Sequence, residues 1–137
     1  MRINVFFYGL FMDQEILEKN GIHPSNPRKG YLPNYTLKIG NRASLIPSKN
    51  EKAYGIIMTM NDAEVVKLYA EKSVADYIPE QVEVVTETNK HLTATCYNLP
   101  FELLTGTNET YAKSLYELAR KLGFPEEYLK KINEYRN

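Results

Sequence analysis

Three groups of residues in this sequence have the types and spacing needed for chemistry, and the first follows the N-terminal apolar run. Residues 8–13 read Tyr-Gly-Leu-Phe-Met-Asp, so a predicted strand ends at a glycine and a helix start follows. Free backbone amides in such a turn, together with the helix dipole, favour a bound carboxylate or phosphate. The turn has one glycine and no following Lys-Ser or Lys-Thr, which excludes a phosphate-binding P-loop. An ordinary strand–turn–helix connection explains the same residues, and both interpretations stay open.

The second group lies between residues 68 and 80, where a predicted helix ends and a strand follows. Glu71 falls at the predicted end of this helix, where the dipole favours cations over carboxylates. A carboxylate placed against the dipole is a candidate for catalysis, and a solvated surface glutamate is the alternative. Asp76 and Glu80 are further candidates by the same argument, although Asp76 can equally cap the next turn.

Tyrosine forms the third group, because the chain has 11 tyrosines and no tryptophan. Most of these side chains are expected to pack with a buried ring and a hydroxyl near water. Tyr8 and Tyr97 stand at the ends of apolar strands, where a hydroxyl can reach the mouth of a pocket. Arg42 lies in a predicted turn, where it either meets an anion or faces solvent.

Metal and thiol chemistry are not expected. The chain has one cysteine, Cys96, and two histidines, His23 and His91, and these residues lack the spacing of a zinc site. Cys96 lies in an alternating apolar run and is predicted to be a small buried thiol. His91 would point to the opposite face of the same strand, which argues against a Cys–His pair. We therefore predict neither a metal nor a cofactor.

Length and charge limit the class of protein. A chain of 137 residues fits one domain, residues 1–137, since compact domains cluster near roughly 100–150 residues. Its 17 basic and 17 acidic residues give no net charge, which argues against nucleic acid as a partner. No stretch approaches the roughly 18 apolar residues of a membrane span, and no secretory signal is recognised, so a cytoplasmic protein is expected.

The elements that must position these groups follow from periodicity and turn residues. Alternating or β-branched runs predict strands at residues 3–8, 31–39, 43–46, 53–60, 82–85 and 92–99, with a loop at 22–29 and a turn at 47–52. Helices are predicted near residues 13–21 and from 61 to about Glu71, and two more at the C-terminal end, 111–122 and from 125 onwards. About six short strands followed by helices indicate an α+β domain. Closing the sheet into a small mixed β-barrel, with the helices outside, would remove its exposed edges.

Taken in order, several of these segments resemble the γ-glutamylcyclotransferase-like superfamily. Val-Phe-Phe-Tyr-Gly at residues 5–9 resembles the opening Tyr-Gly-Ser or Tyr-Gly-Thr signature of that family. Ala-Tyr-Gly-Ile-Ile-Met-Thr-Met at 53–60 is similar to its central Val-x-Gly-x-hydrophobic strand. A helix after that strand, a tyrosine-bearing strand at 95–98 and the C-terminal helices with Glu-Glu-Tyr at 126–128 extend the resemblance over nearly the whole chain.

The resemblance implies a γ-glutamylcyclotransferase-like barrel and an enzyme that releases 5-oxoproline from a γ-glutamyl amide. The substrate's α-amine attacks its own γ-carbonyl, and a carboxylate moves the proton, so the reaction needs neither a metal nor a covalent enzyme intermediate. By position, Glu71 would be the base. The turn formed by Tyr8, Gly9, Leu10 and Phe11 would hold the substrate's α-carboxylate, and the Tyr97 hydroxyl would line the pocket, with Arg42 a further substrate-binding candidate.

The sequence also departs from the family pattern at two positions. Leu10 stands where relatives have serine or threonine, so binding there would depend on backbone amides. An ungapped alignment places Lys72, rather than Glu71, at the position of the family's glutamate. One residue rotates a helical side chain by about 100°. Two further hypotheses therefore stay open: a catalytically inactive small-molecule-binding relative on the same fold, and an interaction module with a vestigial pocket.

Overall fold

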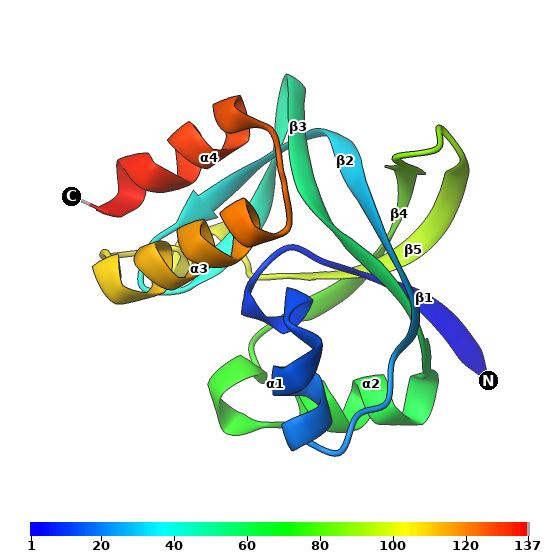
Figure 1. Cartoon of the computed structure of the whole chain (residues 1–137). Helices are drawn as coiled ribbons and strands as arrows, with labels where there is room; N and C mark the ends of the chain where they lie inside the picture. Colours follow the sequence, from blue (N-terminus) through cyan, green and yellow to red (C-terminus); the bar gives the residue numbers. More distant parts are fainter. Residues whose placement is uncertain (137) are drawn as a thin grey trace.

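The computed structural model describes residues 1–136, and its centre is a closed five-stranded barrel (Figure 1). The strands are β1 (Arg2–Phe7), β2 (Ser25–Ile39), β3 (Ala43–Asn61), β4 (Ile78–Thr86) and β5 (His91–Asn98). They follow the order β1-β3-β2-β4-β5, with antiparallel neighbours except for the parallel pair β1 and β5 that closes the barrel. The prediction of an α+β fold with a small mixed barrel is confirmed.

The barrel has five strands instead of about six because residues 43–46 and 53–60 belong to one strand, β3. The predicted turn at 47–52 is a large bulge. Pro33 pairs with Lys52 and Tyr35 with Pro47, so residues 48–51 stand opposite Asn34 alone. Asn34 adopts a φ of 65°, and its side chain accepts a hydrogen bond from the Asn50 amide. Proline is tolerated at such an irregularity because no ladder hydrogen bond depends on its missing N–H.

The predicted loop at 22–29 is also partly wrong, since β2 begins at Ser25. The register shifts between the pairs Ser25–Thr59 and Arg28–Ile57, and Pro27 lies at that shift. Proline and asparagine are typical of loops, but a bulged strand accommodates them as well. The β2–β3 hairpin is therefore much longer than the sequence suggests, and its far end carries the turn with Arg42.

The helices lie outside the barrel, as predicted. They are α1 (Gln14–Lys19), α2 (Asp62–Tyr69), α3 (Glu109–Lys121) and α4 (Glu126–Asn133), with short 3₁₀ turns η1 (Leu10–Met12), η2 (Lys72–Val74), η3 (Phe101–Leu103) and η4 (Glu134–Arg136). The Asp13 and Asn61 side chains cap α1 and α2 by accepting from the amides of Glu15 and Ala63. Figure 1 shows α3 and α4 together on one side of the barrel, and α1 and α2 on another.

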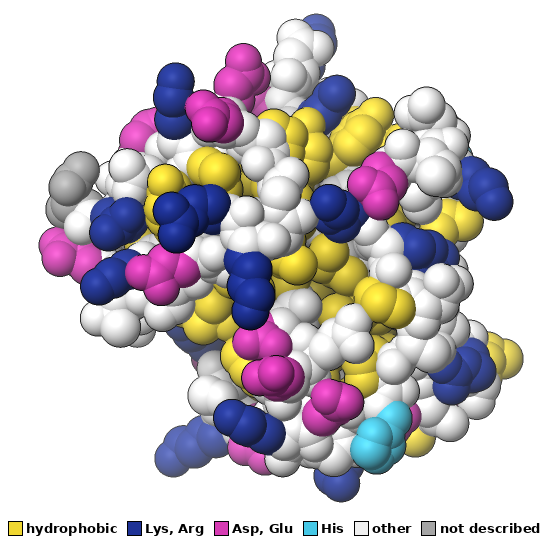
Figure 2. All heavy atoms as spheres, viewed as in Figure 1, with side chains coloured by type: hydrophobic (Ala, Val, Ile, Leu, Met, Phe, Trp, Pro, Cys, Tyr) yellow, Lys and Arg dark blue, Asp and Glu magenta, His cyan; other side chains and the backbone are white. Residues whose placement is uncertain are grey.

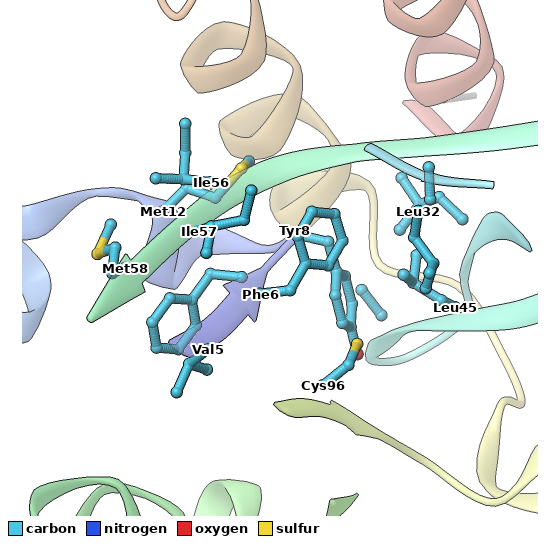
Figure 3. Packing of buried hydrophobic residues seen from close by; sticks show 14 of the residues in the cluster. Val5, Phe6, Tyr8, Met12, Leu32, Leu45, Ile56, Ile57, Met58 and Cys96 are labelled. Atoms are coloured by element: carbon cyan, nitrogen blue, oxygen red, sulfur yellow. The ribbon is translucent and has the colours of Figure 1, made fainter. Parts of the chain in front are cut away.

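The core fills the barrel with side chains from neighbouring strands. Phe6, Ile57 and Cys96 are all buried, and Figure 3 shows the Tyr8 side chain reaching toward Cys96 in this interior. The prediction that Cys96 is a buried thiol is confirmed. Burial, with a smaller effect of the Glu80 charge, raises the pKa of the Cys96 thiol to about 12.

The surface has mixed charge. Figure 2 shows one face, on which Lys and Arg are interspersed with Asp and Glu over the region of α3 and α4. Within residues 1–136, no helix is both long enough and apolar enough to cross a membrane. The same residues contain no group of three or more His, Cys, Asp or Glu side chains arranged to hold a metal ion.

Candidate functional site

A cavity of about 350 Å³ opens where four parts of the chain meet: the exit of β1, the β2–β3 turn, the segment around the end of α2, and the start of α3. Concave sites of this size suit small molecules. The lining residues are Phe6, Phe7, Tyr8, Gly9, Leu10, Phe11, Ile16, Asn41, Arg42, Ala43, Tyr69, Ser73, Val74, Tyr77, Asn108 and Tyr111.

The β2–β3 turn is held against the segment that leads into α3. The Asn41 amide donates to the Thr105 carbonyl at 2.6 Å, and the Asn108 side chain donates to the Asn41 carbonyl at 3.0 Å. A Cβ on Gly40 would lie 2.7 Å from the Thr105 carbonyl oxygen, so glycine permits this close approach. Asn108 also caps α3 by accepting from the Tyr111 amide. These contacts fix the backbone that carries Arg42.

Arg42 is the only cationic side chain that lines the cavity within the described part of the chain. Its Nη1 lies 3.1 Å from Oδ2 of Asp76, and the guanidinium carbon lies 6.0 Å from the centre of the Tyr77 ring. The Arg42 side chain is 29% exposed and that of Asp76 is 58% exposed. An ion pair this open to water contributes little stability, so the carboxylate of a ligand can compete for Arg42.

Two tyrosine hydroxyls at the cavity donate hydrogen bonds to backbone carbonyls. The Tyr8 hydroxyl donates to the Tyr97 carbonyl at 2.7 Å, and the Tyr77 hydroxyl donates to the Ala43 carbonyl at 2.6 Å. Burial raises the pKa of Tyr8 well above its ordinary value. Burial also raises the pKa of Tyr77 to about 12, against the opposing effect of Arg42. Both phenols are therefore neutral near neutral pH and cannot serve as bases.

Aromatic rings form one wall of the cavity. Phe11 makes edge-to-face contacts with Phe7 and with Tyr69, each with ring centres 6.0 Å apart. Behind this wall, Tyr69 stacks on Tyr97 with centres 3.8 Å apart and planes 3° from parallel. Such contacts stabilise ring positions beyond the effect of buried area alone. The wall is therefore a fixed apolar surface.

The exit of β1 supplies backbone donors. The Met12 amide donates to the Gly9 carbonyl and the Asp13 amide to the Leu10 carbonyl, each at 3.0 Å, which forms the η1 turn. Leu10 and Phe11 are the first residues of that turn, so their amides have no acceptor within it.

The structure brings five of the predicted site residues to this one cavity: Tyr8, Gly9, Leu10, Phe11 and Arg42. Tyr97 does not line the cavity. Its ring stacks on Tyr69, which does line it, and its backbone carbonyl accepts the hydrogen bond from the Tyr8 hydroxyl.

Glu71 lies at the edge of the site. Helix α2 ends at Tyr69, so Glu71 follows the helix instead of occupying its last turn, and its backbone is extended with φ −58° and ψ 137°. Its side chain is exposed and is not among those that line the cavity, whereas Tyr69 and Ser73, two positions away on either side, are. A role for Glu71 as a base stays a prediction.

The other two acidic candidates have structural partners. Asp76 pairs with Arg42, and Glu80 accepts a hydrogen bond of 2.7 Å from the Asn98 side chain, outside the cavity. Within residues 1–136, no aspartate or glutamate side chain lines the cavity. Its one charged lining group is thus a cation.

Sequence reasoning missed Tyr69, Tyr77, Tyr111 and Asn108 as lining residues. The tyrosines look like packing residues in a chain that has 11 of them, and no local pattern separates those that face a cavity. Asn108 carried a usable signal, because an asparagine just before a predicted amphipathic helix indicates an N-cap.

The sequence and fold of this chain are similar to those of known proteins. The family model described as the AIG2-like family matches residues 52–132. A curated γ-glutamylcyclotransferase from Bos taurus is 27% identical over 96 residues, which cover 69% of this chain and 51% of that protein. This chain thus spans about half the length of that curated relative.

Solved structures agree in fold. One described as a gamma-glutamyl cyclotransferase superposes with a TM-score of 0.76 at 20% identity, covering 97% of this chain and 87% of the other. YkqA from Bacillus subtilis gives a TM-score of 0.80 at 19% identity, covering 99% of this chain and 54% of the other. With a matching family model and this barrel, the chain belongs to the AIG2-like family, within the γ-glutamylcyclotransferase-like superfamily.

Proposed function

We propose that the cavity binds a small molecule of the γ-glutamyl amide class, with the α-carboxylate of its glutamyl unit directed to Arg42. The resemblance implied the turn at residues 8–11 for this carboxylate, and we assign it to Arg42 instead because Arg42 is the one charged side chain that lines the cavity in residues 1–136. The observation that carries this proposal is the placement of Arg42 in the same cavity as the backbone turn at Gly9, Leu10 and Phe11. The curated relative and a structural neighbour are both described as γ-glutamylcyclotransferases, which supports the choice of ligand class.

The charges at the mouth suit the head of an amino acid. A free α-amino acid group carries a carboxylate and an ammonium on one carbon atom. Arg42 has N–H donors for the carboxylate besides the one at Nη1 that Asp76 accepts, and a guanidinium binds carboxylates well. Asp76 lies beside it, at 3.1 Å, and offers a carboxylate to the ammonium. The pair therefore complements both charges of the ligand head.

Ring closure to 5-oxoproline is the second candidate function, with Glu71 as general base. In this reaction the α-nitrogen forms a bond to the carbonyl carbon of the γ-glutamyl amide, the bond from that carbonyl carbon to the amide nitrogen breaks, and the proton taken from the α-amine goes to the leaving amine. The α-amine is mostly protonated near neutral pH, so a base is required. Glu71 is favoured because Tyr69 and Ser73 on either side of it line the cavity, and its exposed side chain would have to turn inward when substrate binds.

Calorimetry and a product assay separate the two candidates. The purified chain is titrated with γ-glutamyl amides and tested for release of 5-oxoproline, alongside Glu71→Gln and the control Glu117→Gln, an exposed residue on α3. Binding without release by any of the three proteins supports a binding function alone. Release that Glu71→Gln abolishes and Glu117→Gln retains supports catalysis. No binding and no release across the panel would contradict both.

A further inference from the structure

Two groups of residues that differ in polarity line the cavity. The Tyr77 ring lies 6.0 Å from the Arg42 guanidinium carbon and 6.1 Å from the Tyr69 ring. The Tyr69 ring in turn lies 6.0 Å from the Phe11 ring, so the cavity has a polar and an apolar end.

The polar end is formed by Asn41 and Arg42 in the β2–β3 turn and by Asn108 at the start of α3, which are joined by the hydrogen bond from Asn108 to the Asn41 carbonyl. Asp76 adds a carboxylate there through its pair with Arg42. The amino-acid head of a bound γ-glutamyl unit fits this end.

The other end is apolar. Phe7 and Phe11 come from β1 and the turn after it, Ile16 from α1, and Tyr69 from the end of α2. Phe11 contacts the rings of Phe7 and Tyr69 edge-on, so the three rings form a continuous surface. Phe11 and Ile16 are only half-buried, and a ligand group can therefore cover apolar surface that water now contacts.

From this polarity we infer that the γ-glutamyl amide carries an apolar aromatic or branched aliphatic group on its amide nitrogen. This inference rests on the proposed function, because it places the glutamyl head at Arg42. The group on the amide nitrogen then extends from the polar end toward Phe11 and Ile16. Those two residues determine specificity for the amine part of the ligand.

The apolar end of the cavity disfavours ligands with a charged group on the amine part. Arg42 is the only charged side chain lining the cavity in the described part of the chain, and it is engaged by the head. An ammonium at the apolar end would lose its hydration without gaining a partner, which is costly in a protein interior. Amides of diamines are therefore poor ligands, and amides of aromatic or branched amines are good ones.

Four amides that differ only in the amine part test the inference: γ-glutamylphenethylamide, γ-glutamylisopentylamide, γ-glutamylmethylamide and γ-glutamylputrescine. Dissociation constants are measured by calorimetry on the whole chain. Burial of one aromatic or branched side group is expected to make the first two bind about ten- to a hundredfold more tightly than the methylamide. The putrescine amide is expected to bind no better than the methylamide.

Substitutions in the apolar end test whether Phe11 and Ile16 cause the preference for apolar amines. Phe11→Ala and Ile16→Ala are each expected to lower the ratio between phenethylamide and methylamide affinities toward one, whereas Phe101→Ala, on an exposed ring outside the cavity, leaves the ratio unchanged. Equal affinities of all four amides, or tighter binding of the putrescine amide, overturn this inference while the proposed function stands. Failure of all four to bind overturns the proposed function and this inference with it.

Discussion

The hydroxyl of Tyr111 lies 2.5 Å from the position that a Cβ atom would occupy on Gly9. Gly9 has a φ of −111°, which any residue can adopt, so the requirement for glycine comes from packing and not from backbone conformation. Tyr111 is carried by the first turn of α3. The contact thus joins the exit of β1 to α3 beside the cavity. Local sequence patterns do not predict that these two parts of the chain meet.

Replacing Gly9 with alanine is expected to displace the Tyr111 ring and to destabilise the fold by about 1–3 kcal/mol, the usual range for overpacking. Urea unfolding measures the change. Tyr111→Phe removes the hydroxyl that the new Cβ would meet. The double variant Gly9→Ala/Tyr111→Phe should therefore have a higher free energy of unfolding than the single variant Gly9→Ala. If Gly9→Ala unfolds at the same urea concentration as the wild type, the close contact does not exist in solution.

Arg42→Gln is expected to weaken binding of γ-glutamylphenethylamide by at least about tenfold, because a hydrogen bond to a charged group contributes about 1.5–3 kcal/mol. Its pair with Asp76 is open to water, so the loss of stability should be small. Arg120→Gln, an exposed residue on the same protein, serves as the matched control and should bind as the wild type does. Unchanged affinity in Arg42→Gln would show that the ligand head lies elsewhere.

Much of the fold is predictable from local patterns. The β-branched run before Gly9, the capping residues Asp13 and Asn61, and the amphipathic spacing of Leu115 in α3 each specify an element through neighbours in sequence, and the structure has each of them. Closure into a barrel followed from the need to remove sheet edges.

The remaining features depend on contacts between distant residues. The bulge opposite Asn34 turns two predicted strands into β3, because proline signals a break locally, whereas β3 accommodates the extra residues 48–51 in the bulge and pairs with β2 on both sides of it. The cavity joins Arg42 to Tyr77 and Asn108, which are far apart in sequence. The position of Glu71 depends on where α2 ends, and a shift of two residues moves its side chain from the helix to the exposed segment after it.

Asn98 is a buried polar residue whose side-chain oxygen and nitrogen both form hydrogen bonds. Its Oδ1 accepts from the Leu45 amide at 3.1 Å and from the Ser44 hydroxyl at 3.3 Å, and its Nδ2 donates to Glu80. Asn98→Ala leaves these groups without their partner and should cost about 1–3 kcal/mol in the free energy of unfolding. Asn133→Ala, at an exposed site, should change it by less than about 0.5 kcal/mol. Equal effects of the two substitutions in urea unfolding would contradict the hydrogen-bonded arrangement.

Cys96 should make the protein less stable in alkali. Burial raises the pKa of its thiol from 9.0 to about 12 in the folded chain. As the pH rises, the unfolded chain releases this proton first, so the contribution to stability is complete below pH 9.0 and is lost between 9.0 and about 12. Urea unfolding on either side of pH 9.0 measures the loss, which should be smaller in Cys96→Ala because alanine has no proton to release. The same alkaline loss in both proteins would show that the thiol does not contribute.

The position of the bound ligand is the most direct test of the proposal that a γ-glutamyl amide occupies this cavity. Backbone amide chemical shifts are followed by NMR while γ-glutamylphenethylamide is added to the isotope-labelled chain. We predict that the largest changes fall at Gly9, Leu10, Phe11 and Arg42, with smaller ones at Tyr69 and Tyr111. Saturable changes confined to another part of the barrel, or none at all, would contradict the account.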